Sequence, residues 1–406
     1  MLGKNLQEIK LIDELEISGK VVFIRADFNV PVVDGKITDD YRIRAAIPTI
    51  KYAMDQGAKV VLGTHFGRPK GKPEDWKKYS LEIVANRLAE LTNYDVLLVE
   101  VPTSDAPKAL LQTLRPNQLV MLENLRFEPG EEANTEFLVE RISKYAEVYI
   151  NDAFGASHRA HASIVGLPVV FQQKGIGFLM KKEVEMLDLV LSTNESPYVA
   201  ILGGSKVSDK IEIIDHLADK VDTFVIGGAM AYTFLKAAGY AVGSSLVEKD
   251  KLTFAKNFLE RMATRGKSVL LPLDHVVARK FGDPKELSRI TDNSSIDEGW
   301  MGLDIGPKTQ SAFKEAILAA KVVFWNGPMG VFENPDYAAG SMTIAKAMAE
   351  SDAMTIVGGG DSASAAQMAG VTDSLSHVST GGGASLEYLQ GVPLPGLLAL
   401  RGKKIH

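Results

Sequence analysis

The sequence predicts an α/β protein with two doubly wound parallel-sheet domains. Its 406 residues, 46% of them hydrophobic and 24% charged, are enough for two sizeable cores. Short runs of apolar β-formers alternate with helical stretches, and continuous apolar strands between helices are typical of parallel sheets covered on both faces. The runs form two successive sets of about six. We therefore expect two Rossmann-like domains joined by a connector helix, with a cleft between them.

The first set of runs predicts a domain over residues 1–180. Residues 181–194 then form one amphipathic helix, with Val184, Leu187 and Leu191 on one face, and this helix is the expected connector. The strands of the first domain are expected within 20–30, 59–69, 94–100, 118–127 and 147–155, with a helix over 80–91.

The second set of runs predicts a domain over residues 195–393. The remaining tail, residues 394–406, is too short for a unit of its own, so we expect it to pack on a surface already formed. The strands of this domain are expected within 197–204, 222–230, 268–274, 321–328, 353–361 and 376–384, with a helix over 208–221.

The composition excludes several classes of site. The formal net charge is −6 and neither half of the chain is basic, so binding of nucleic acid is not expected. The absence of cysteine excludes disulfides, thiolate nucleophiles and cysteine-ligated metals. No apolar run approaches about 18 residues, and the N-terminus lacks the apolar centre of a signal peptide, so we expect a cytoplasmic protein without a membrane span.

Charged side chains follow the strands of the first half, at the sheet edge where open parallel sheets bind ligands. Arginine presents a planar donor fork suited to carboxylate and phosphate, so their convergence predicts a site for a small, multiply charged anion. The candidates are Arg25, Asp27, Asn29, Arg42, His65, Arg68, Glu123, Asn124, Arg126, Asn151, Asp152, His158, Arg159 and His161.

Some of these side chains also have structural interpretations. Arg25 could pair with a neighbouring carboxylate and brace its loop, and Arg44, beside Arg42, could form a salt bridge on the solvated rim. His161 could be a hydrogen-bonded structural histidine. The spacing of His158 and His161 suggests a metal, but no third ligand is nearby, which disfavours zinc.

Glycines end the strands of the second half, at Gly203–Gly204, Gly227–Gly228, Gly358–Gly360 and Gly381–Gly383. Glycine lets backbone N–H groups approach a phosphate, so we expect backbone amides to face a ligand here. The GGGDSA segment formally matches the dinucleotide fingerprint, but the acid expected about 20 residues later is missing. No complete Walker loop is present either.

Lys206 and Lys210 are the candidates for the cations expected beside a phosphate, although two ordinary surface lysines would also explain them. They are four residues apart at the start of the predicted helix, so we expect them to share one face. Asp361 follows the glycines and is either a ligand of Mg²⁺ on bound phosphates or the N-cap of the next helix. Asn326 and Glu333 suit a ribose and a base edge.

Eight segments together resemble the phosphoglycerate kinase family, in order from the first strand to the tail. The chain departs from the family at Phe66, where leucine is usual, at Ala229, and at Ser362, where threonine is also common. None of these positions is a charged residue that the chemistry needs. The segments are RADFNVP (25–31), THFGRP (64–69), LENLRF (122–127), NDAFGASHRAHAS (151–163), ILGGSKVSDK (201–210), WNGPMGVFE (325–333), GGGDS (358–362) and STGGGASLEYL (379–389).

The resemblance implies a monomeric enzyme that transfers a phosphoryl group from 1,3-bisphosphoglycerate to Mg-ADP, giving 3-phosphoglycerate and ATP, directly and in line after hinge closure. By the family's motifs, Asp27 and Asn29 meet the glycerate, and Arg42 lies near its carboxyl end. The phosphate that is not transferred is held by His65, Arg68, Arg126 and Arg159. Phe28, Phe66 and Gly67 belong to the same substrate-binding segments.

The resemblance places the nucleotide on the second domain and packs the C-terminal tail back on the first. Lys206 and Lys210 hold the nucleotide and, with Arg42, the transferring phosphoryl group. Glu333 contacts ribose, and Asp361 binds Mg²⁺. The other expected nucleotide-binding residues are Gly204, Gly228, Gly302, Asn326, Gly359, Gly360 and Ser362, with Gly381, Gly382 and Gly383 as an anion-binding helix N-terminus.

Two other functions fit parts of the sequence. An NAD-dependent dehydrogenase fits the GGGDSA match and the doubly wound halves, but it requires the ribose-binding acid that is missing. A nucleic-acid-binding scaffold fits the arginine-rich strand ends, but the aromatic residues that would stack on bases are not interleaved with them.

Overall fold

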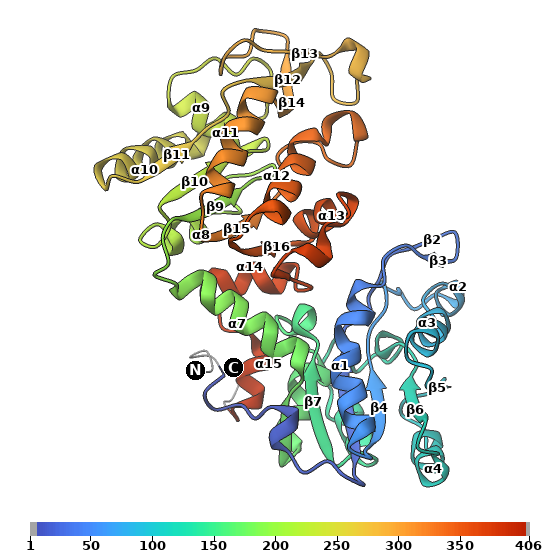
Figure 1. The fold of residues 1–406 in the computed structure, drawn as a ribbon. Coiled ribbons are helices and arrows are strands. Elements are labelled where there is room, and N and C mark those ends of the chain that lie inside the picture. The colour runs from blue at the N-terminus through green and yellow to red at the C-terminus, as the bar shows by residue number, and fades with distance from the viewer. Residues whose placement is uncertain (1–5, 403–406) are drawn as a thin grey trace. The chain divides into compact units, whose positions relative to one another are not determined.

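The chain divides into two compact units in a computed structural model that describes residues 6–402 (Figure 1). The first unit contains the chain up to Asp188 and again from Val392, and the second contains Leu189–Gly391. Helix α7 (Phe178–Ser192) overlaps the range predicted for the connector, residues 181–194, and the division between the units falls within α7. Residues 1–5 of the predicted first domain and 403–406 of the predicted tail lie outside the described residues.

A six-stranded parallel sheet forms the centre of the first unit. Its strands are buried on both faces because helices cover them, which explains their continuous apolar runs. The central strand β1 pairs with β4 and β7, so that Val22 lies between Val60 and Val148. In spatial order the strands are β5 (Asp95–Val99), β6 (Gln118–Leu122), β4 (Lys59–Gly63), β1 (Val21–Ala26), β7 (Val148–Asp152) and β8 (Gln173–Ile176).

Helices α1 (Tyr41–Asp55) and α3 (Glu82–Thr92) pack on one core of this sheet. Ile43 and Ile50 of α1 are fully buried against Ile24 of β1 and its neighbours. Burying an aliphatic side chain of this size contributes about 1.5–3 kcal/mol, so the core fixes where the ends of β1 and β4 lie. The unit also contains α2 (Pro73–Lys78), α4 (Ala106–Thr113), α5 (Glu136–Ser143), and a two-stranded hairpin of β2 (Val32–Val33) and β3 (Lys36–Ile37).

The sequence analysis missed β8, which pairs in parallel with β7 at the edge of the sheet. Its sequence, QKGI, has two polar residues and a glycine, so it carries no strand pattern. The glycine is required because a Cβ atom at Gly175 would collide with the carbonyl oxygen of Lys10. Leu11 forms an isolated bridge to Ile176 beside this contact.

The second unit has a parallel sheet of the same size, as the fold class predicts. Helices lie on both of its faces, and its largest fully buried side chain is Trp325. The strand order is β11 (Ser268–Leu270), β10 (Thr223–Ile226), β9 (Tyr198–Leu202), β15 (Val322–Asn326), β16 (Met354–Gly358) and β17 (His377–Val378). The helices are α8 (Ile211–Leu217), α9 (Met230–Ala237), α10 (Leu252–Thr264), α11 (Pro307–Leu318), α12 (Ala339–Glu350), α13 (Gly360–Met368) and α14 (Gly383–Leu389).

A three-stranded antiparallel sheet in the second unit was not predicted. It consists of β13 (Arg289–Ile290), β12 (His275–Ala278) and β14 (Met301–Ile305), and two of these strands are too short or too polar to show a strand pattern. Arg279 and Arg289 lie over the ring of Trp300, 5.0 and 4.2 Å from its centroid. Strand β14 of this sheet carries Gly302 and Leu303 to the wall of a pocket.

The last described helix, α15 (Pro395–Leu400), packs within the first unit. It lies against the π-helical turn Ala162–Gly166 and α6 (Leu167–Val170). Gly396 donates its N–H to the carbonyl of Ser157 at 2.9 Å. Between residues 6 and 402, no helix combines the length and the apolar character that crossing a bilayer would require.

Candidate active site

Asp27 is the centre of the charged cluster at the strand ends of the first unit. It follows β1 and is 3% exposed, and its Oδ2 accepts a hydrogen bond from Arg42 Nη1 at 2.9 Å. Its Oδ1 accepts from the N–H of Asn29 at 3.2 Å and lies 4.0 Å from His65 Nδ1. Burial opposes ionisation, but the charges of Arg42 and Arg25 outweigh it and lower the pKa of Asp27 to about 2. Asp27 is therefore a carboxylate throughout the physiological range.

The loops after β1 and β4 are tied together by side-chain to backbone hydrogen bonds. Phe28 N–H donates to Thr64 Oγ1 at 2.9 Å, and Gly67 N–H donates to Asn29 Oδ1 at 2.8 Å. Gly67 has φ +61°, and a Cβ atom there would collide with the ring of Tyr79, so only glycine fits this loop. The structure thus brings Asp27, Asn29 and the segment from His65 to Arg68 together, as predicted.

Phe28 and Phe66 belong to the predicted substrate-binding segments, but their side chains lie in the hydrophobic core. Their rings anchor the two loops to the core of the first unit. Any contact that these residues make with a ligand would come from their backbone atoms.

Arg126 joins the cluster from the loop after β6. Its N–H donates to Asn124 Oδ1 at 3.1 Å, and its Nη1 donates to the carbonyl of Gly67. Arg126 Nε lies 3.0 Å from Glu132 Oε1. Burial lowers the pKa of Arg126, and the positive charges of Arg159, Arg25 and Arg68 lower it further. Glu132 alone among these neighbours raises it. Several guanidinium groups therefore lie close enough to repel one another, and an anion would relieve this repulsion.

The histidines of the HRAH segment are structural neighbours of this cluster. Arg159 Nε donates to His158 Nε2 at 3.4 Å, and His161 Nδ1 lies 3.9 Å from Glu131 Oε1. Burial and the charges of Arg25 and Arg126 lower the pKa of His161 to about 3, so it is neutral. Within residues 6–402, no group of three or more His, Asp or Glu side chains could hold a metal ion.

The rim interpretation of Arg44 is correct. Arg44 Nε lies 2.7 Å from Asp40 Oδ1 one turn away, and Asp40 is also bound by Arg87 at 2.7 Å. Arg42, two residues earlier, is 29% exposed and binds the buried Asp27 of the charged cluster instead of a carboxylate on the rim.

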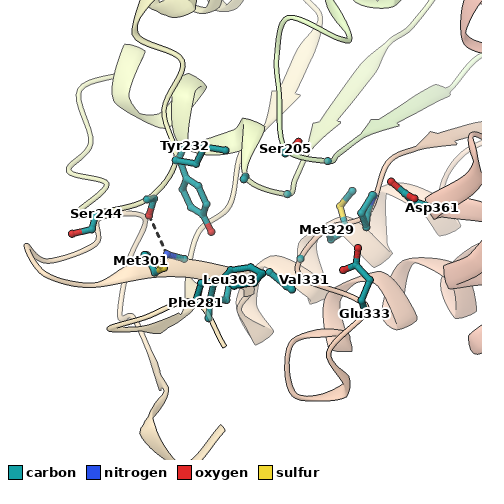
Figure 2. A pocket seen from close by; sticks show the side chains of 18 residues that line it. Ser205, Tyr232, Ser244, Phe281, Met301, Leu303, Met329, Val331, Glu333 and Asp361 are labelled. Atoms are coloured by element: carbon teal, nitrogen blue, oxygen red, sulfur yellow. Dashed lines mark hydrogen bonds between the residues drawn. The ribbon is translucent and has the colours of Figure 1, made fainter. Parts of the chain in front are cut away.

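A pocket of about 480 Å³ opens at the strand ends of the second unit (Figure 2). Ser244 and Tyr232 lie toward one end of it, and Glu333 and Asp361 toward the other. Of the predicted nucleotide-binding residues, five line the pocket, namely Gly204, Gly228, Gly302, Glu333 and Asp361. The predicted residues that do not line it are Lys206, Lys210, Asn326, Gly359, Gly360, Ser362, Gly381, Gly382 and Gly383.

Most of the pocket wall is apolar. Met301 and Leu303 of β14, Met329 and Val331 of the loop after β15, and the ring of Tyr232 form it. Gly302 N–H donates to Ser245 Oγ at 3.0 Å, which holds β14 at the pocket. An apolar slot with acidic and polar groups at its ends suits a flat ring carrying a polar chain.

The prediction that the glycine amides of the first two loops face a ligand is wrong. Gly204 N–H donates to the carbonyl of Pro328 at 2.9 Å, and Gly228 N–H donates to the carbonyl of Met329 at 3.0 Å. A Cβ atom at Gly228 would lie 2.5 Å from Gly204 N and 2.7 Å from Pro328 O. These glycines therefore let three strand-end loops pack backbone against backbone and form the floor of the pocket.

The glycines after β16 lead into an uncapped helix. Gly359 has φ +89° and precedes α13, and no side chain caps the first turn of that helix. Asp361 is the second residue of α13, so the N-cap interpretation of Asp361 is wrong. Ser362 is fully buried, and its Oγ accepts from Gly327 N–H at 2.5 Å. Its hydroxyl thus holds the loop after β15, and the amides of the first turn of α13 are available to an anion.

Lys206 and Lys210 do not share a helix face, contrary to the prediction. Helix α8 begins at Ile211, with Lys210 as its N-cap residue, and Lys206 lies in the preceding loop. Lys206 is exposed, whereas Lys210 is 9% exposed and its Nζ donates to Asn326 Oδ1. Burial lowers the pKa of Lys210, and the charges of Asp209 and Asp361 oppose this shift.

The sequence analysis missed Glu248, which organises the loop between the two lysines. Its Oε2 accepts from the N–H groups of Val207 and Ser208, the latter at 3.2 Å, and its Oε1 accepts from Ser208 Oγ at 2.6 Å. Glu248 is 40 residues away in a segment without a recognisable motif, so no sequence signal pointed to it.

The glycines at 381–383 form a short turn before α14. Gly381 N–H donates to Ser379 Oγ at 3.1 Å, and Gly382 has φ +50°. Helix α14 has only 7 residues, so its dipole is weak.

Comparison with known proteins gives one consistent result. The family model described as phosphoglycerate kinase matches residues 12–392. A phosphoglycerate kinase of Bdellovibrio bacteriovorus is 54% identical over 98% of this chain and 99% of its own, and one from an Anaeromyxobacter species is 52% identical over 97% of this chain and 100% of its own.

Solved structures agree with the sequence relatives. The structure of phosphoglycerate kinase from Coxiella burnetii has a TM-score of 0.83 and 38% identity, covering 97% of this chain and 98% of that one. The enzyme from Pyrococcus horikoshii has a TM-score of 0.81 and 33% identity, covering 96% and 98%. The likeness extends over nearly the whole of each chain, and this chain belongs to the phosphoglycerate kinase family.

Proposed function

We propose that the chain, which is a phosphotransferase of glycolysis by its family, transfers a phosphoryl group reversibly from 1,3-bisphosphoglycerate to Mg-ADP. The products are 3-phosphoglycerate and ATP. The observation that carries the proposal is the group of arginines around the ionised Asp27 on a unit separate from the one that holds the apolar pocket. This division suits two different anionic substrates.

The first unit would bind the three-carbon acid. Guanidinium groups bind phosphate through paired N–H donors, and Arg68, Arg126 and Arg159 are mutually repulsive until an anion arrives. His65 adds an imidazole beside them. The carboxylate of Asp27 would accept a hydrogen bond from the hydroxyl of the glycerate, and the side-chain amide of Asn29 would donate one to it. Arg42, held by Asp27, would face the carboxyl end and the group in transfer.

The second unit would bind ADP or ATP. The apolar pocket suits the base, Glu333 suits the ribose hydroxyls, and the uncapped first turn of α13 suits the phosphates. Lys206 and Lys210 would neutralise the phosphate charge from the loop before α8.

Asp361 fits a magnesium ion that arrives with the nucleotide. It is an exposed carboxylate at the pocket, and Mg²⁺ takes one or two carboxylates together with substrate phosphates. The absence of a three-ligand cluster in the described part of the chain agrees with a metal that the nucleotide helps to hold. When bound, Mg²⁺ supplies positive charge that neutralises the phosphate oxygens.

The reaction would proceed without a covalent enzyme intermediate. A β-phosphate oxygen of ADP forms the new P–O bond while the bond between the phosphorus and the acyl oxygen breaks, leaving the carboxylate of 3-phosphoglycerate. Charge develops on the transferring group, so catalysis consists of positioning and cationic stabilisation by Arg42, Lys206 and Lys210. Since the substrates are held on separate units, turnover requires a closing step, which also excludes water.

A coupled assay tests this proposal. Purified protein is mixed with 1,3-bisphosphoglycerate, ADP and Mg²⁺, and ATP formation is followed through hexokinase and glucose-6-phosphate dehydrogenase. We expect ATP only when all three components are present. Protein that binds NADH in a fluorescence titration and forms no ATP would support the dehydrogenase instead.

The same proposal includes a monomeric state. Both sets of substrate-binding residues come from one chain, so no second copy is needed to complete them. Light scattering coupled to size-exclusion chromatography should give a mass near 44.0 kDa.

A further inference from the structure

A row of buried polar contacts joins Glu131, Ser163 and Arg25 to His65, and the mechanism above assigns these three residues no function. It begins at Arg25, which is fully buried at the end of β1. Arg25 Nε donates to Ser163 Oγ at 2.6 Å, Nη1 donates to the carbonyl of Ala26, and Nη2 lies 3.2 Å from His65 Nδ1. All three nitrogens of the guanidinium group are thus engaged.

Glu131 anchors the other end of this row. It is fully buried, its Oε1 accepts from Ser163 Oγ, and its Oε2 accepts from Ser163 N–H at 3.0 Å. Arg25 Nη2 lies 3.9 Å from Glu131 Oε1, so the two buried charges compensate each other. Tyr149 fixes the segment further because its hydroxyl donates to the carbonyl of Ser163 at 2.7 Å.

The contact with Arg25 decides which nitrogen of His65 carries the proton. A guanidinium group can only donate, so His65 Nδ1 must be the acceptor. The neutral imidazole then carries its proton on Nε2. Asp27 Oδ1 is the competing partner of Nδ1, but at 4.0 Å it is beyond hydrogen-bond distance.

We propose that Glu131, Ser163 and Arg25 form a positioning relay that holds His65 as the neutral tautomer with its proton on Nε2, ready to donate to the phosphate of the three-carbon acid. The identity of that ligand rests on the proposed function. The tautomer is a property of the protein before any ligand binds. The three relay residues act through His65 and touch no reacting atom.

The charges around His65 work in the same direction. The groups that face it are Asp27, Arg25, Arg126 and Arg159. Burial and the three arginines hold the pKa of His65 well below its usual range, and Asp27 opposes them only in part. His65 therefore keeps one N–H donor and no charge across the range in which ordinary histidines titrate.

Removing the relay is expected to change the protonation state of His65. Without Ser163 Oγ, Arg25 Nε loses its acceptor, and the nearest carboxylate oxygen to the guanidinium group is Glu131 Oε1, 3.9 Å from Nη2. Turning toward this carboxylate draws Nη2 away from His65. Nδ1 is then free to take a proton beside the carboxylate of Asp27. The relay thus separates two states of His65, a neutral donor and an imidazolium ion paired with Asp27.

Nitrogen-15 NMR of the full-length, ligand-free protein tests the relay. With histidine labelled, two-bond ¹H–¹⁵N correlations distinguish the two tautomers, and His65→Gln assigns the signal among the 7 histidines. We expect His65 to carry its proton on Nε2 and to show no titration from about pH 5.5 to about pH 8. A proton on Nδ1, or a midpoint near that of an ordinary histidine, would overturn the proposal.

Variants test the relay through function. In Ser163→Ala we expect the His65 midpoint to rise toward the range of an ordinary histidine. The KM for 3-phosphoglycerate then becomes pH-dependent over that range, with kcat changed less than KM. Ser163→Thr keeps the hydroxyl and should restore the flat profile. Arg44→Gln removes an exposed arginine of the same unit and is the matched control.

The outcomes separate the relay from the proposed function. Arg25→Gln should have a larger effect than Ser163→Ala, and if it fails to fold, Ser163→Ala and its threonine counterpart decide. A wild-type protein that forms ATP but has the wrong tautomer refutes the relay alone. A protein that forms no ATP refutes the proposed function, and the spectrum still reports on the relay. A KM profile that is the same in Ser163→Ala and wild type refutes the relay.

Discussion

The side chains of Lys210 and Asn326 are hydrogen-bonded to each other, with the ammonium group as donor. Asn326 Nδ2 in turn donates to the carbonyl of Gly358 at 2.8 Å. This pair joins the residue before α8 to the ends of β15 and β16. A buried lysine is thereby held within the electrostatic reach of Asp361, where the nucleotide phosphates are proposed to bind.

Lys210→Ala should therefore weaken the binding of ADP. A hydrogen bond from a charged group contributes about 1.5–3 kcal/mol, so we expect a loss of affinity of roughly 10- to 100-fold. Isothermal titration calorimetry with Mg-ADP measures it. Lys256→Ala, at an exposed lysine 4.0 Å from Glu260 on α10, is the control and should bind normally. Unchanged affinity in the first variant would remove Lys210 from the nucleotide site.

Arg42→Ala should lower kcat by roughly 10³, as loss of a transition-state arginine does in phosphoryl transfer. Affinity for ADP should stay near that of the wild type, because Arg42 lies on the other unit. Steady-state kinetics and calorimetry separate the two effects. Arg44→Ala removes a rim arginine two residues away and should retain full kcat. If Arg42→Ala also retained most of its kcat, the proposed role of Arg42 in the chemistry would be wrong.

Gly228→Ala should destabilise the second unit and close part of its pocket. The new methyl group would lie within 2.7 Å of three backbone atoms, at a residue with φ +62°. Backbone strain and overpacking each cost about 1–3 kcal/mol, so we expect a total loss of more than 2 kcal/mol. Urea unfolding followed by circular dichroism measures it.

Gly239→Ala is the matched control for this substitution. Gly239 has φ +94° in the same unit, but a Cβ atom there would meet nothing within 4 Å. This variant reports the backbone strain alone, about 1–2 kcal/mol. Equal losses of unfolding free energy in the two variants would show that the three loops leave room for a methyl group at Gly228.

Asp304 should make the stability of the second unit depend on pH. Burial raises its pKa to about 7, although its oxygens accept from Gly340 N–H at 2.8 Å and Ile305 N–H at 2.9 Å. The folded state binds this proton more tightly than the unfolded chain, whose aspartate pKa is about 3.9. The contribution of Asp304 to stability is therefore fully present below about pH 4 and is lost as the pH rises to about 7.

Asp304→Asn should remove this dependence. We expect the free energy of unfolding from urea titrations to change less between about pH 5 and about pH 7.5 in the variant than in the wild type. Asp352→Asn, at an exposed position of the same unit, is the control and should follow the wild type. A variant that kept the wild-type pH profile would mean that Asp304 ionises as an exposed carboxylate does.

The sequence was sufficient to predict the two parallel sheets because their strands are buried on both faces. Such strands are continuous apolar runs, as in VVFIRA of β1 and VVFWN of β15. It was insufficient for β8 and for the sheet of β12, β13 and β14. Strand β8 has two polar residues and a glycine, β13 has only two residues, β12 begins with a histidine, and β14 contains a glycine and an aspartate, so tertiary contacts rather than an apolar pattern define them.

The charged half of the site was easier to predict than the glycine-rich half. A guanidinium group after a strand end usually binds a carboxylate or a phosphate, and Arg42 does donate to the carboxylate of Asp27. A glycine has two opposite uses, because its amide can bind a ligand or its missing side chain can admit another backbone. Gly204 and Gly228 do the second, and no sequence shows which carbonyl lies opposite an amide. The spacing of the two lysines likewise did not indicate that α8 begins only at Ile211.

The packing of α15 on the π-helical turn Ala162–Gly166 has a consequence for biosynthesis. Leu397 and Ala399 are buried, and Ala399 shares a core with Ala153 and Ile164, about 240 residues earlier in the chain. During synthesis this core can form only after the whole of the second unit, Leu189–Gly391, has been translated. The apolar face that contains Ala153 and Ile164 therefore stays uncovered until α15 has been synthesised.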